Sequence, residues 1–202
     1  PPQMAVLGEF DAHVAPGAHI EPLVLADTTL GPVLVCTGAR VAAFTRLVGP
    51  CVIGAHAIVA GGRIAASAIG EHTRGHGELS TSIFIGHANK AHEGFVGHSV
   101  IGRWANLGAG TITSNLKNSY GVVSLWTPSG VRTTGLAFAG SFIGDHAKTG
   151  IGTRLTTGTV IGAGANVFGD RMPPKFVPPF AWGDAEPFGE FAVEKFLEVA
   201  ER

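Results

Sequence analysis

The residues of this chain that are best suited to chemistry lie in one stretch, NKAHEGFVGHSVIGRWANLGAGTITSN. It contains His92, whose imidazole titrates near neutral pH and can serve as a general base. Asn106 and Asn115 flank the glycine-rich turn at 108–110, and their amides can hydrogen-bond hydroxyl groups and carbonyls. Backbone N–H groups of such a turn can bind a developing oxyanion. A possible base followed by amide and backbone hydrogen-bonding groups makes this stretch the candidate site.

The nine histidines make a metal site the competing interpretation. His87 and His92 are five residues apart, and His72 and His76 are four apart. A mononuclear zinc site needs three or four ligands in a tetrahedral array. These pairs do not supply a complete set, so we assign no metal ligand.

The composition excludes several classes of function. Charged residues make up only 14% of the 202 residues, the net charge is −1, and the basic residues are scattered, which argues against nucleic-acid binding. No apolar run reaches the roughly 18 residues that a membrane span needs, and no signal peptide is visible. Cys36 and Cys51 have apolar neighbours, so we expect buried free thiols and a cytoplasmic location.

A six-residue period is the strongest structural signal in the chain. It fits neither a helix nor a hairpin strand, but it fits a short strand followed by a turn, with three such units completing one triangular coil. Stacked coils would bury one continuous column of small and aliphatic side chains. The inward positions form two ladders, Val35, Val41, Leu47, Ile53, Val59 and Ala65, then Ala137, Ile143, Thr149, Leu155, Ile161 and Val167.

These units resemble the hexapeptide repeats of left-handed parallel β-helices. The predicted fold is therefore all-β, with a left-handed parallel β-helix at 1–168, an extended proline-rich strap at 169–189 and a C-terminal α-helix at 190–202 that caps the column or packs on a neighbouring subunit. The pattern breaks at about 66–95 and 113–134, where we expect loops that interrupt the column. The resemblance also implies a homotrimer with active sites between subunits.

The stretch around His92 resembles the acetyltransferase domain of the bifunctional enzyme that makes UDP-N-acetylglucosamine. In that family a Lys-Ala segment leads to a catalytic histidine. An aromatic residue, an asparagine, a Gly-Ala-Gly-Thr turn and a second asparagine then follow. The matching residues are Lys90, Ala91, His92, Phe95, Asn106, Gly108 to Thr111 and Asn115.

The resemblance implies a role for each of these positions. His92 would be the general base and Asn115 a catalytic partner, and Lys90, Phe95 and Asn106 would bind the substrate. Arg63 falls where the family places an arginine that binds the sugar phosphate, and the guanidinium group suits a phosphate monoester. Acetyl-CoA would lie along the turn and the later coils, at Ala109, Gly110, Ala139, Thr157 and Ala163.

Two positions depart from the family. Phe95 stands in place of a tyrosine and lacks the hydroxyl group that contacts the sugar phosphate. Gly121 falls where the family carries a lysine, and Lys117 is the nearest lysine in this sequence. The pocket for an amino-sugar phosphate is therefore expected to be only partly conserved in its chemistry.

A closer resemblance is to the C-terminal β-helix of sugar-1-phosphate nucleotidyltransferases related to the same bifunctional enzyme. Those proteins carry an N-terminal nucleotidyltransferase domain, in which Mg²⁺ would act. This chain contains no glycine-rich nucleotide loop and begins with PPQMAVLGEF. We therefore expect it to be a fragment that lacks the N-terminal domain.

The leading hypothesis is acetyl-CoA-dependent N-acetylation of an amino-sugar 1-phosphate, such as glucosamine 1-phosphate, in nucleotide-sugar biosynthesis. One alternative is a non-catalytic β-helix that trimerises or regulates a sugar-1-phosphate nucleotidyltransferase. A remote alternative is a zinc enzyme like the γ-class carbonic anhydrases, in which His87 and His92 would mimic a pair of ligands.

Overall fold

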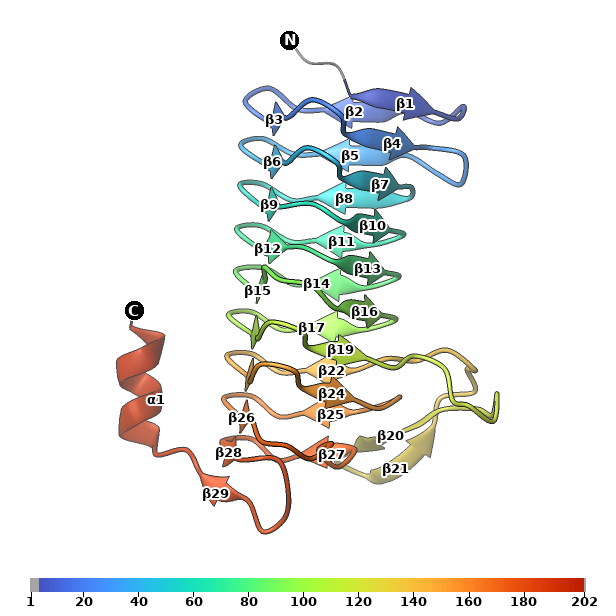
Figure 1. The fold of residues 1–202 in the computed structure, drawn as a ribbon. Helices are drawn as coiled ribbons and strands as arrows, with labels where there is room; N and C mark the ends of the chain where they lie inside the picture. The colour runs from blue at the N-terminus through green and yellow to red at the C-terminus, as the bar shows by residue number, and fades with distance from the viewer. Residues whose placement is uncertain (1–3, 202) are drawn as a thin grey trace.

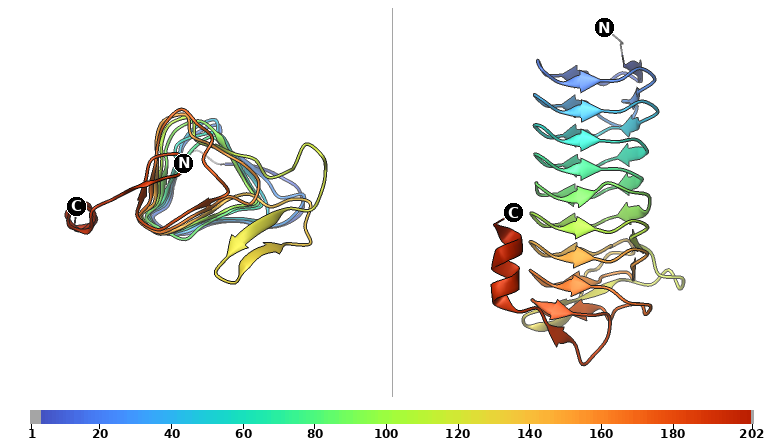
Figure 2. Two further views of the ribbon diagram at one scale, coloured as in Figure 1. Left: turned by 90° about the horizontal axis from the view of Figure 1, so that it is seen from below. Right: turned by 60° about the vertical axis from the view of Figure 1, so that its left-hand side comes forward.

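The computed structural model describes residues 4–201 and consists mainly of one column of stacked coils (Figure 1). Each coil runs through three short strands, and the strands of successive coils pair in parallel. Seen along its axis the column is a triangle, with three flat faces and three corners (Figure 2). The predicted fold class, a left-handed parallel β-helix of hexapeptide repeats, is confirmed.

Three parallel sheets form the faces, which we name A, B and C. We name each corner by the two faces that it joins, AB, BC or CA. Face A contains β1 (Ala5–Leu7), β4 (Leu25–Asp27), β7 (Arg46–Val48), β10 (Arg63–Ala65), β13 (Glu78–Ser80) and β16 (Phe95–Gly97), and is continued by β19 (Ile112–Thr113) and β24 (Arg154–Leu155).

Faces B and C run through the whole column. Face B contains β2 (Ala12–Val14), β5 (Val33–Val35), β8 (Cys51–Ile53), β11 (Ala68–Ile69), β14 (Ile83–Phe84), β17 (Val100–Ile101), β22 (Phe142–Ile143), β25 (Val160–Ile161) and β27 (Phe176–Val177). Face C contains β3 (His19–Ile20), β6 (Arg40–Val41), β9 (Ile58–Val59), β12 (Arg74–Gly75), β15 (Asn89–Lys90), β18 (Asn106–Leu107), β23 (Lys148–Thr149), β26 (Asn166–Val167), β28 (Ala181–Trp182) and β29 (Gly189–Glu190).

The core is a column of side chains that point inward from all three faces. Residues such as Leu47, Ile53 and Ile64 have no exposed surface. Burying one such side chain contributes about 1.5–3 kcal/mol relative to leaving it in water. All positions of the two predicted ladders are buried except Ala137, which is exposed because the chain has left the column at that point.

A ladder of serines holds corner AB. The Oγ of Ser67 accepts the N–H of Ser82 at 3.0 Å, and the Oγ of Ser82 accepts the N–H of Ser99 at 3.1 Å. The Oγ of Ser99 then accepts the N–H of Ser141 at 2.9 Å. These buried hydroxyl groups satisfy backbone donors where the strands end, so the corner can turn sharply without leaving those donors unpaired.

A ladder of stacked rings covers corner BC. The ring centroids of His56, His72, His87 and Trp104 follow one another at 5.0, 4.9 and 4.3 Å. All four residues have positive φ, so they occupy equivalent turn positions in successive coils. His87 therefore lies on corner BC, whereas His92 lies on corner CA, so one chain does not bring these two histidines together as a pair of zinc ligands.

The predicted loop at 66–95 is also wrong. Strands β11 to β15 continue the three faces through this region with parallel pairing. One coil here is shorter than the repeat predicts, because Arg63 pairs with Glu78 and Ala68 pairs with Ile83, an offset of fifteen residues. A six-residue period therefore cannot be followed through this part of the sequence.

The chain leaves the column after β19 and returns at β22, and the predicted interruption at 113–134 falls in this excursion. The excursion contains the antiparallel hairpin of β20 (Ser124–Thr127) and β21 (Gly130–Thr133). Trp126 stacks on Phe176 of the last coil with ring centroids 3.7 Å apart, and Val123 is fully buried. The hairpin is therefore anchored to the column.

The C-terminal part differs from the prediction in two respects. The segment at 169–189 is not only a strap, because β27 and β28 add part of a last coil with Val177 and Ala181 buried. Helix α1 (Val193–Ala200) is shorter than predicted and lies beside the column rather than over its end (Figure 2). The ring of Phe196 packs edge-on against those of Phe180 and His146, with ring centroids 5.1 and 5.4 Å apart.

Two smaller points complete the description. Cys36 and Cys51 are free thiols, as predicted, but only Cys51 is buried, and Cys36 is half-buried. Burial raises the pKa of Cys51 to about 12. Between residues 4 and 201, no helix is long and apolar enough to cross a bilayer.

Candidate functional site

An open cavity of about 960 Å³ lies beside face A, where the chain leaves the column. The pairing of β19 with β24 places two coils next to each other, and the departing segment at 114–119 forms the opposite wall. The lining residues that the argument uses are Phe95, Asn115, Lys117, Arg154, Thr157 and Lys175.

Three cationic side chains border this cavity, and no carboxylate is among the described residues that line it. Lys117 donates from Nζ to the carbonyl of Val122 at 2.5 Å, and Arg154 donates from Nη2 to the carbonyl of Asp170 at 3.2 Å. Burial, together with the nearby charge of Lys117, lowers the pKa of Lys175. The cavity therefore has the positive character that favours a phosphate group.

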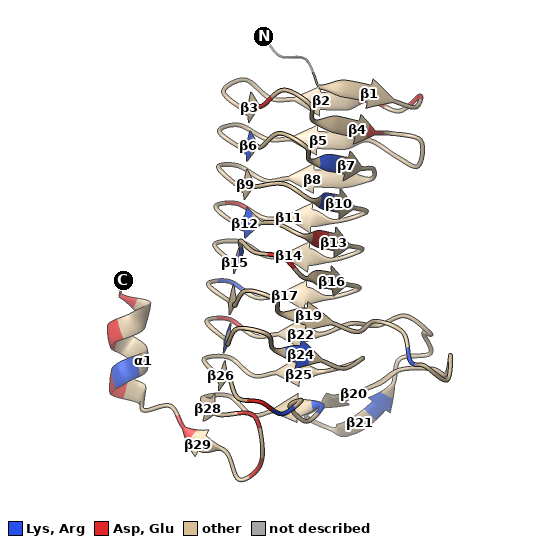
Figure 3. Ribbon diagram, in the orientation of Figure 1, with Lys and Arg blue, Asp and Glu red and all other residues tan. Residues whose placement is uncertain are grey.

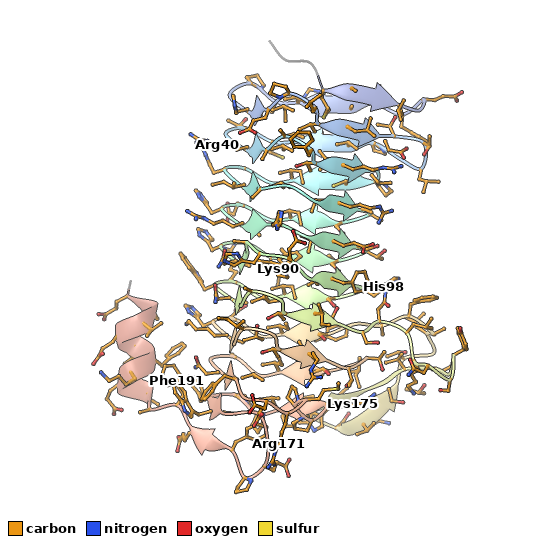
Figure 4. All side chains as sticks on the ribbon, viewed as in Figure 1. Arg40, Lys90, His98, Arg171, Lys175 and Phe191 are labelled. Carbon is orange, nitrogen blue, oxygen red and sulfur yellow. The ribbon has the colours of Figure 1, made fainter. Side chains whose placement is uncertain are left out.

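Asn115 connects the cavity with corner AB. Its Nδ2 lies 2.8 Å from Nδ1 of His98, and the His98 ring stacks on Phe138 with centroids 5.2 Å apart. Figure 4 shows His98 on the side of the column from which the excursion leaves. Burial lowers the pKa of His98, which favours the neutral form of its imidazole. The sequence indicates only a turn residue here, but the structure places His98 against Asn115.

His92 lies on corner CA, in the turn between β15 and β16, and its side chain is exposed. Strand β16 separates His92 from His98, the residue that contacts Asn115. Within one chain, Asn115 is therefore paired with His98 and not with His92. The same corner holds His76, whose Nε2 lies 3.4 Å from Oε1 of Glu93.

Lys90 does not reach the surface. Its side chain is fully buried inside the column, and its Nζ donates to the carbonyl of His92 and, at 2.9 Å, to that of Glu93. Burial lowers the pKa of Lys90 to about 8, against a smaller opposing effect of the Glu93 charge. The prediction that Lys90 binds the substrate is wrong, because an enclosed ammonium group cannot contact one.

The glycine-rich turn is part of the hydrogen-bond ladder between coils. The N–H of Gly108 donates to the carbonyl of Thr149 at 3.1 Å, and the N–H of Gly110 donates to that of Glu93 at 3.1 Å. The carbonyl of Ala109 accepts the N–H of the next coil's turn. Of the predicted oxyanion donors at 108–110, the N–H groups of Gly108 and Gly110 therefore already have partners within the column.

Asn106 and Arg63 lie on flat faces of the column. Asn106 is on face C, where its Oδ1 accepts the Nδ2 of Asn89 at 2.5 Å. Arg63 is on face A, in register with Glu78 and Phe95, and its Nη1 lies 3.6 Å from Oε1 of Glu78. Figure 3 shows this pair as the blue β10 next to the red β13. Arg63 and Phe95 therefore share a face, two coils apart.

The residues predicted to bind CoA are spread over three corners, with Ala109 and Gly110 on corner CA. Thr157 lines the cavity, and the neighbouring Ala139 accepts the N–H of Gly158 at 3.3 Å. Ala163 is exposed on corner BC, where its carbonyl accepts the N–H of Phe180 at 3.0 Å. Of the residues that are distant in sequence, the fold brings Thr157 and Ala139 together, and it leaves the turn at 109–110 and Ala163 on other corners.

Sequence reasoning missed the cations of the cavity. Arg154 and Lys175 lie far along the chain from Asn115, and they reach it only because later coils stack below β19. No local motif marks these residues. Among residues 4–201, no group of three or more His, Cys, Asp or Glu is placed to hold a metal ion.

Comparison with known proteins supports the predicted resemblance. No protein-family model matches the chain. Over 91 residues it is 33% identical to the bifunctional sugar-1-phosphate nucleotidylyltransferase/acetyltransferase of Sulfurisphaera tokodaii, a match that covers 45% of this chain and 23% of that protein. Over 98 residues it is 35% identical to the bifunctional protein GlmU of Methanococcus vannielii, covering 46% and 23%. The match thus spans about a quarter of each relative, and the predicted resemblance to such bifunctional enzymes is confirmed.

Among solved structures, the chain is similar to AntD, an N-acyltransferase from Bacillus cereus whose crystal structure holds dTDP and 3-hydroxybutyryl-CoA. The two chains are 12% identical, with a TM-score of 0.36, and the similarity covers 93% of this chain and 87% of AntD.

Proposed function

We propose that this chain, a hexapeptide-repeat β-helix similar in sequence to bifunctional nucleotidyltransferase–acetyltransferases, transfers an acetyl group from acetyl-CoA to the amine of an amino-sugar 1-phosphate. The observation that carries the proposal is the cationic cavity beside Phe95 and Asn115, two residues of the stretch that resembles the family. The names of both relatives, one of which includes acetyltransferase, support the reaction class.

The substrate class follows from the charges of the cavity. Lys117, Arg154 and Lys175 present positive charge without a lining carboxylate, which suits the phosphate group of a sugar 1-phosphate. The apolar ring of Phe95 offers a surface for the sugar, and the amide of Asn115 can bond a hydroxyl group or the acetyl carbonyl. The volume of about 960 Å³ leaves room for part of the CoA arm, against Thr157.

The reaction requires a base and a donor to the oxyanion. The amine nitrogen attacks the thioester carbon, the C–N bond forms, and the C–S bond then breaks to release CoA. His92 accepts the proton from the amine and returns it to the departing sulfur. With the N–H groups of Gly108 and Gly110 already engaged, the amide N–H of Asn115 is the proposed donor to the oxyanion.

The proposed assembly is a homotrimer, in which His92 of one chain meets the cavity of the next. This arrangement accounts for the separation of His92 from Asn115 within one chain. Face B supports association between copies, because none of its strands contains Asp, Glu, Lys or Arg (Figure 3). Its outward side chains include Leu34, Val52, Ile83 and Phe142, all partly exposed. Contiguous apolar surface of this kind marks contacts between proteins.

The test is release of CoA from acetyl-CoA in the presence of glucosamine 1-phosphate. His92→Ala is expected to lower kcat by about 10²- to 10⁴-fold, the usual contribution of a general base. His87→Ala, on corner BC, is the matched control and should leave kcat unchanged. His98→Ala tests whether His98, rather than His92, acts as the base. If His98→Ala abolishes activity and His92→Ala does not, the base has been assigned to the wrong residue.

The phosphate site is tested separately. Lys175→Met is expected to raise the KM for glucosamine 1-phosphate by about tenfold while leaving the KM for acetyl-CoA unchanged. Wild-type protein that forms trimers but releases no CoA with any amino-sugar phosphate would support the non-catalytic alternative instead.

A further inference from the structure

The turn that carries His92 differs from the other four-residue turns of corner CA, whereas the shorter turns at 60–62 and 76–77 also end in a glycine with positive φ. Four other turns of this corner, at 21–24, 42–45, 108–111 and 150–153, place their third residue in the left-handed region. The φ values there are 65° for Leu23, 62° for Phe44, 70° for Gly110 and 72° for Gly152. In the turn at 91–94 the positive φ moves to the fourth residue, Gly94, at 135°.

In these four turns, which we call the ordinary turns, the fourth residue has a buried side chain. These residues are Val24, Thr45, Thr111 and Thr153. Two of these threonines bond the first carbonyl of their own turn, with Thr45 Oγ1 2.7 Å from Ala42 O and Thr153 Oγ1 2.9 Å from Gly150 O. A side chain at this position therefore holds the turn from within the column.

Gly94 has no side chain to do this, and the ammonium group of Lys90 lies beside it. A Cβ at Gly94 would lie 3.2 Å from Lys90 Nζ and closer still to the backbone carbonyl of Thr111 in the next coil. Lys90 bonds the carbonyls of the second and third residues of the turn, His92 and Glu93. Gly75, which pairs with Lys90 in the preceding coil, contributes no side chain to the column and so leaves room for the lysine stem. Figure 4 shows Lys90 within the stack of coils.

We propose that Lys90 is a positioning residue whose buried ammonium group replaces the threonine of an ordinary turn and fixes the backbone that presents His92. The link to catalysis depends on the proposed function, with His92 as base. The effect on the turn does not depend on it. A buried cation is costly unless it is hydrogen-bonded, so an apolar residue would fill this interior position at lower cost if filling the core were its only role. Its pKa, lowered to about 8 by burial, leaves it charged at pH 7.

The experiment compares Lys90→Met with Leu107→Met, its counterpart in the next coil, whose turn contains Thr111. Amide hydrogen exchange is followed at Gly110, because its N–H donates to the carbonyl of Glu93, the same carbonyl that Lys90 holds. The Gly152 N–H, which donates to Ala109 at 2.8 Å, is the internal reference. Lys90→Met is expected to speed exchange at Gly110 by roughly tenfold or more relative to Gly152. Leu107→Met should leave this ratio unchanged.

The kinetic arm measures kcat and KM in the same two variants. Lys90→Met is expected to lower kcat by about tenfold with little change in either KM, because misplacing a base slows the chemical step more than it weakens binding. Lys90→Gln, which keeps a neutral N–H donor, should recover part of both effects and serves as the second variant if Lys90→Met does not fold. Unchanged exchange at Gly110 in folded Lys90 variants would overturn the proposal. If wild type releases no CoA, the proposed function fails, while the exchange result still decides the role of Lys90.

Discussion

At the scale of single residues, the burial of Lys90 makes the free energy of unfolding depend on pH. Its pKa is about 8 in the folded chain and 10.5 without burial. Between these two values the unfolded chain binds more protons than the folded chain, so the free energy of unfolding rises with pH. The cost of burying the charge is fully present below pH 8 and is removed as the pH approaches 10.5.

We therefore expect the free energy of unfolding of the wild type, taken relative to Lys90→Met, to increase as the pH rises from about 8 to about 10.5. The methionine has a similar stem but no titrating group, so the difference isolates Lys90 from Lys148 and Lys175, whose pKa values are also lowered by burial. Urea unfolding at fixed protein concentration across this range measures it. If the difference in free energy of unfolding between the two proteins does not change with pH, the ammonium group is not buried.

At the scale of elements, the excursion at 114–139 builds one wall of the cavity, and it is held in place mainly by its hairpin. Trp126 stacks on Phe176, and Leu116 bridges to Phe138 where the two ends of the excursion meet. The column itself is complete on the other side of these contacts, because β17 pairs directly with β22. The hairpin can therefore loosen without unfolding the coils.

Trp126→Ala is expected to release the hairpin while changing the midpoint of thermal unfolding little. Loss of an aromatic pair removes about 0.5–1.5 kcal/mol beyond the buried area, and here the loss falls on a peripheral element. Limited trypsin digestion should show faster cleavage after Arg132, which lies on β21. Val131→Ala, at an exposed neighbouring position, is the control. Equal cleavage rates in the two variants would mean that the Trp126 contact does not anchor the hairpin.

At the scale of the whole molecule, the three faces differ in chemistry. Face A exposes Arg46, Arg63 and Glu78, and face C carries Arg40 and Arg74, whereas the strands of face B carry none of these charged residue types. An apolar groove of about 430 Å³ also lies on face B, beside Leu34, Val52 and Ile83. A flat apolar face on a prism is suited to contact with another copy of the same prism.

Ile83→Glu on face B is expected to convert the proposed trimer to monomers, because three carboxylates would be buried at the contact. Ile58→Glu on face C, next to Arg40 and Arg74 in register, is the matched control and should remain trimeric. Sedimentation velocity distinguishes the two states. A wild type that is monomeric at all concentrations, or an Ile83→Glu variant that stays trimeric, would exclude this face as the contact.

Much of the fold could be predicted because each coil obeys a local rule. The inward residue of a six-residue unit must be small or aliphatic, so positions such as Val59 and Ile161 are marked in the sequence itself. The rule fails where coils are shorter, as at 66–95, and where the inward residue is neither small nor aliphatic. Lys90 is such a case, because a lysine in the sequence does not indicate an interior position, although its side chain is buried in the folded column.

The sequence by itself determined the repeat, the all-β class and the stretch that carries the family resemblance, because these depend on residue type and spacing along the chain. Only the tertiary structure decided which side chains meet. Coils of unequal length bring Lys175 and Arg154 to Asn115, place His98 rather than His92 beside that amide, and enclose Lys90. Stacking converts positions one coil apart into neighbours, and the number of residues in each coil, which no local pattern sets, determines which positions those are.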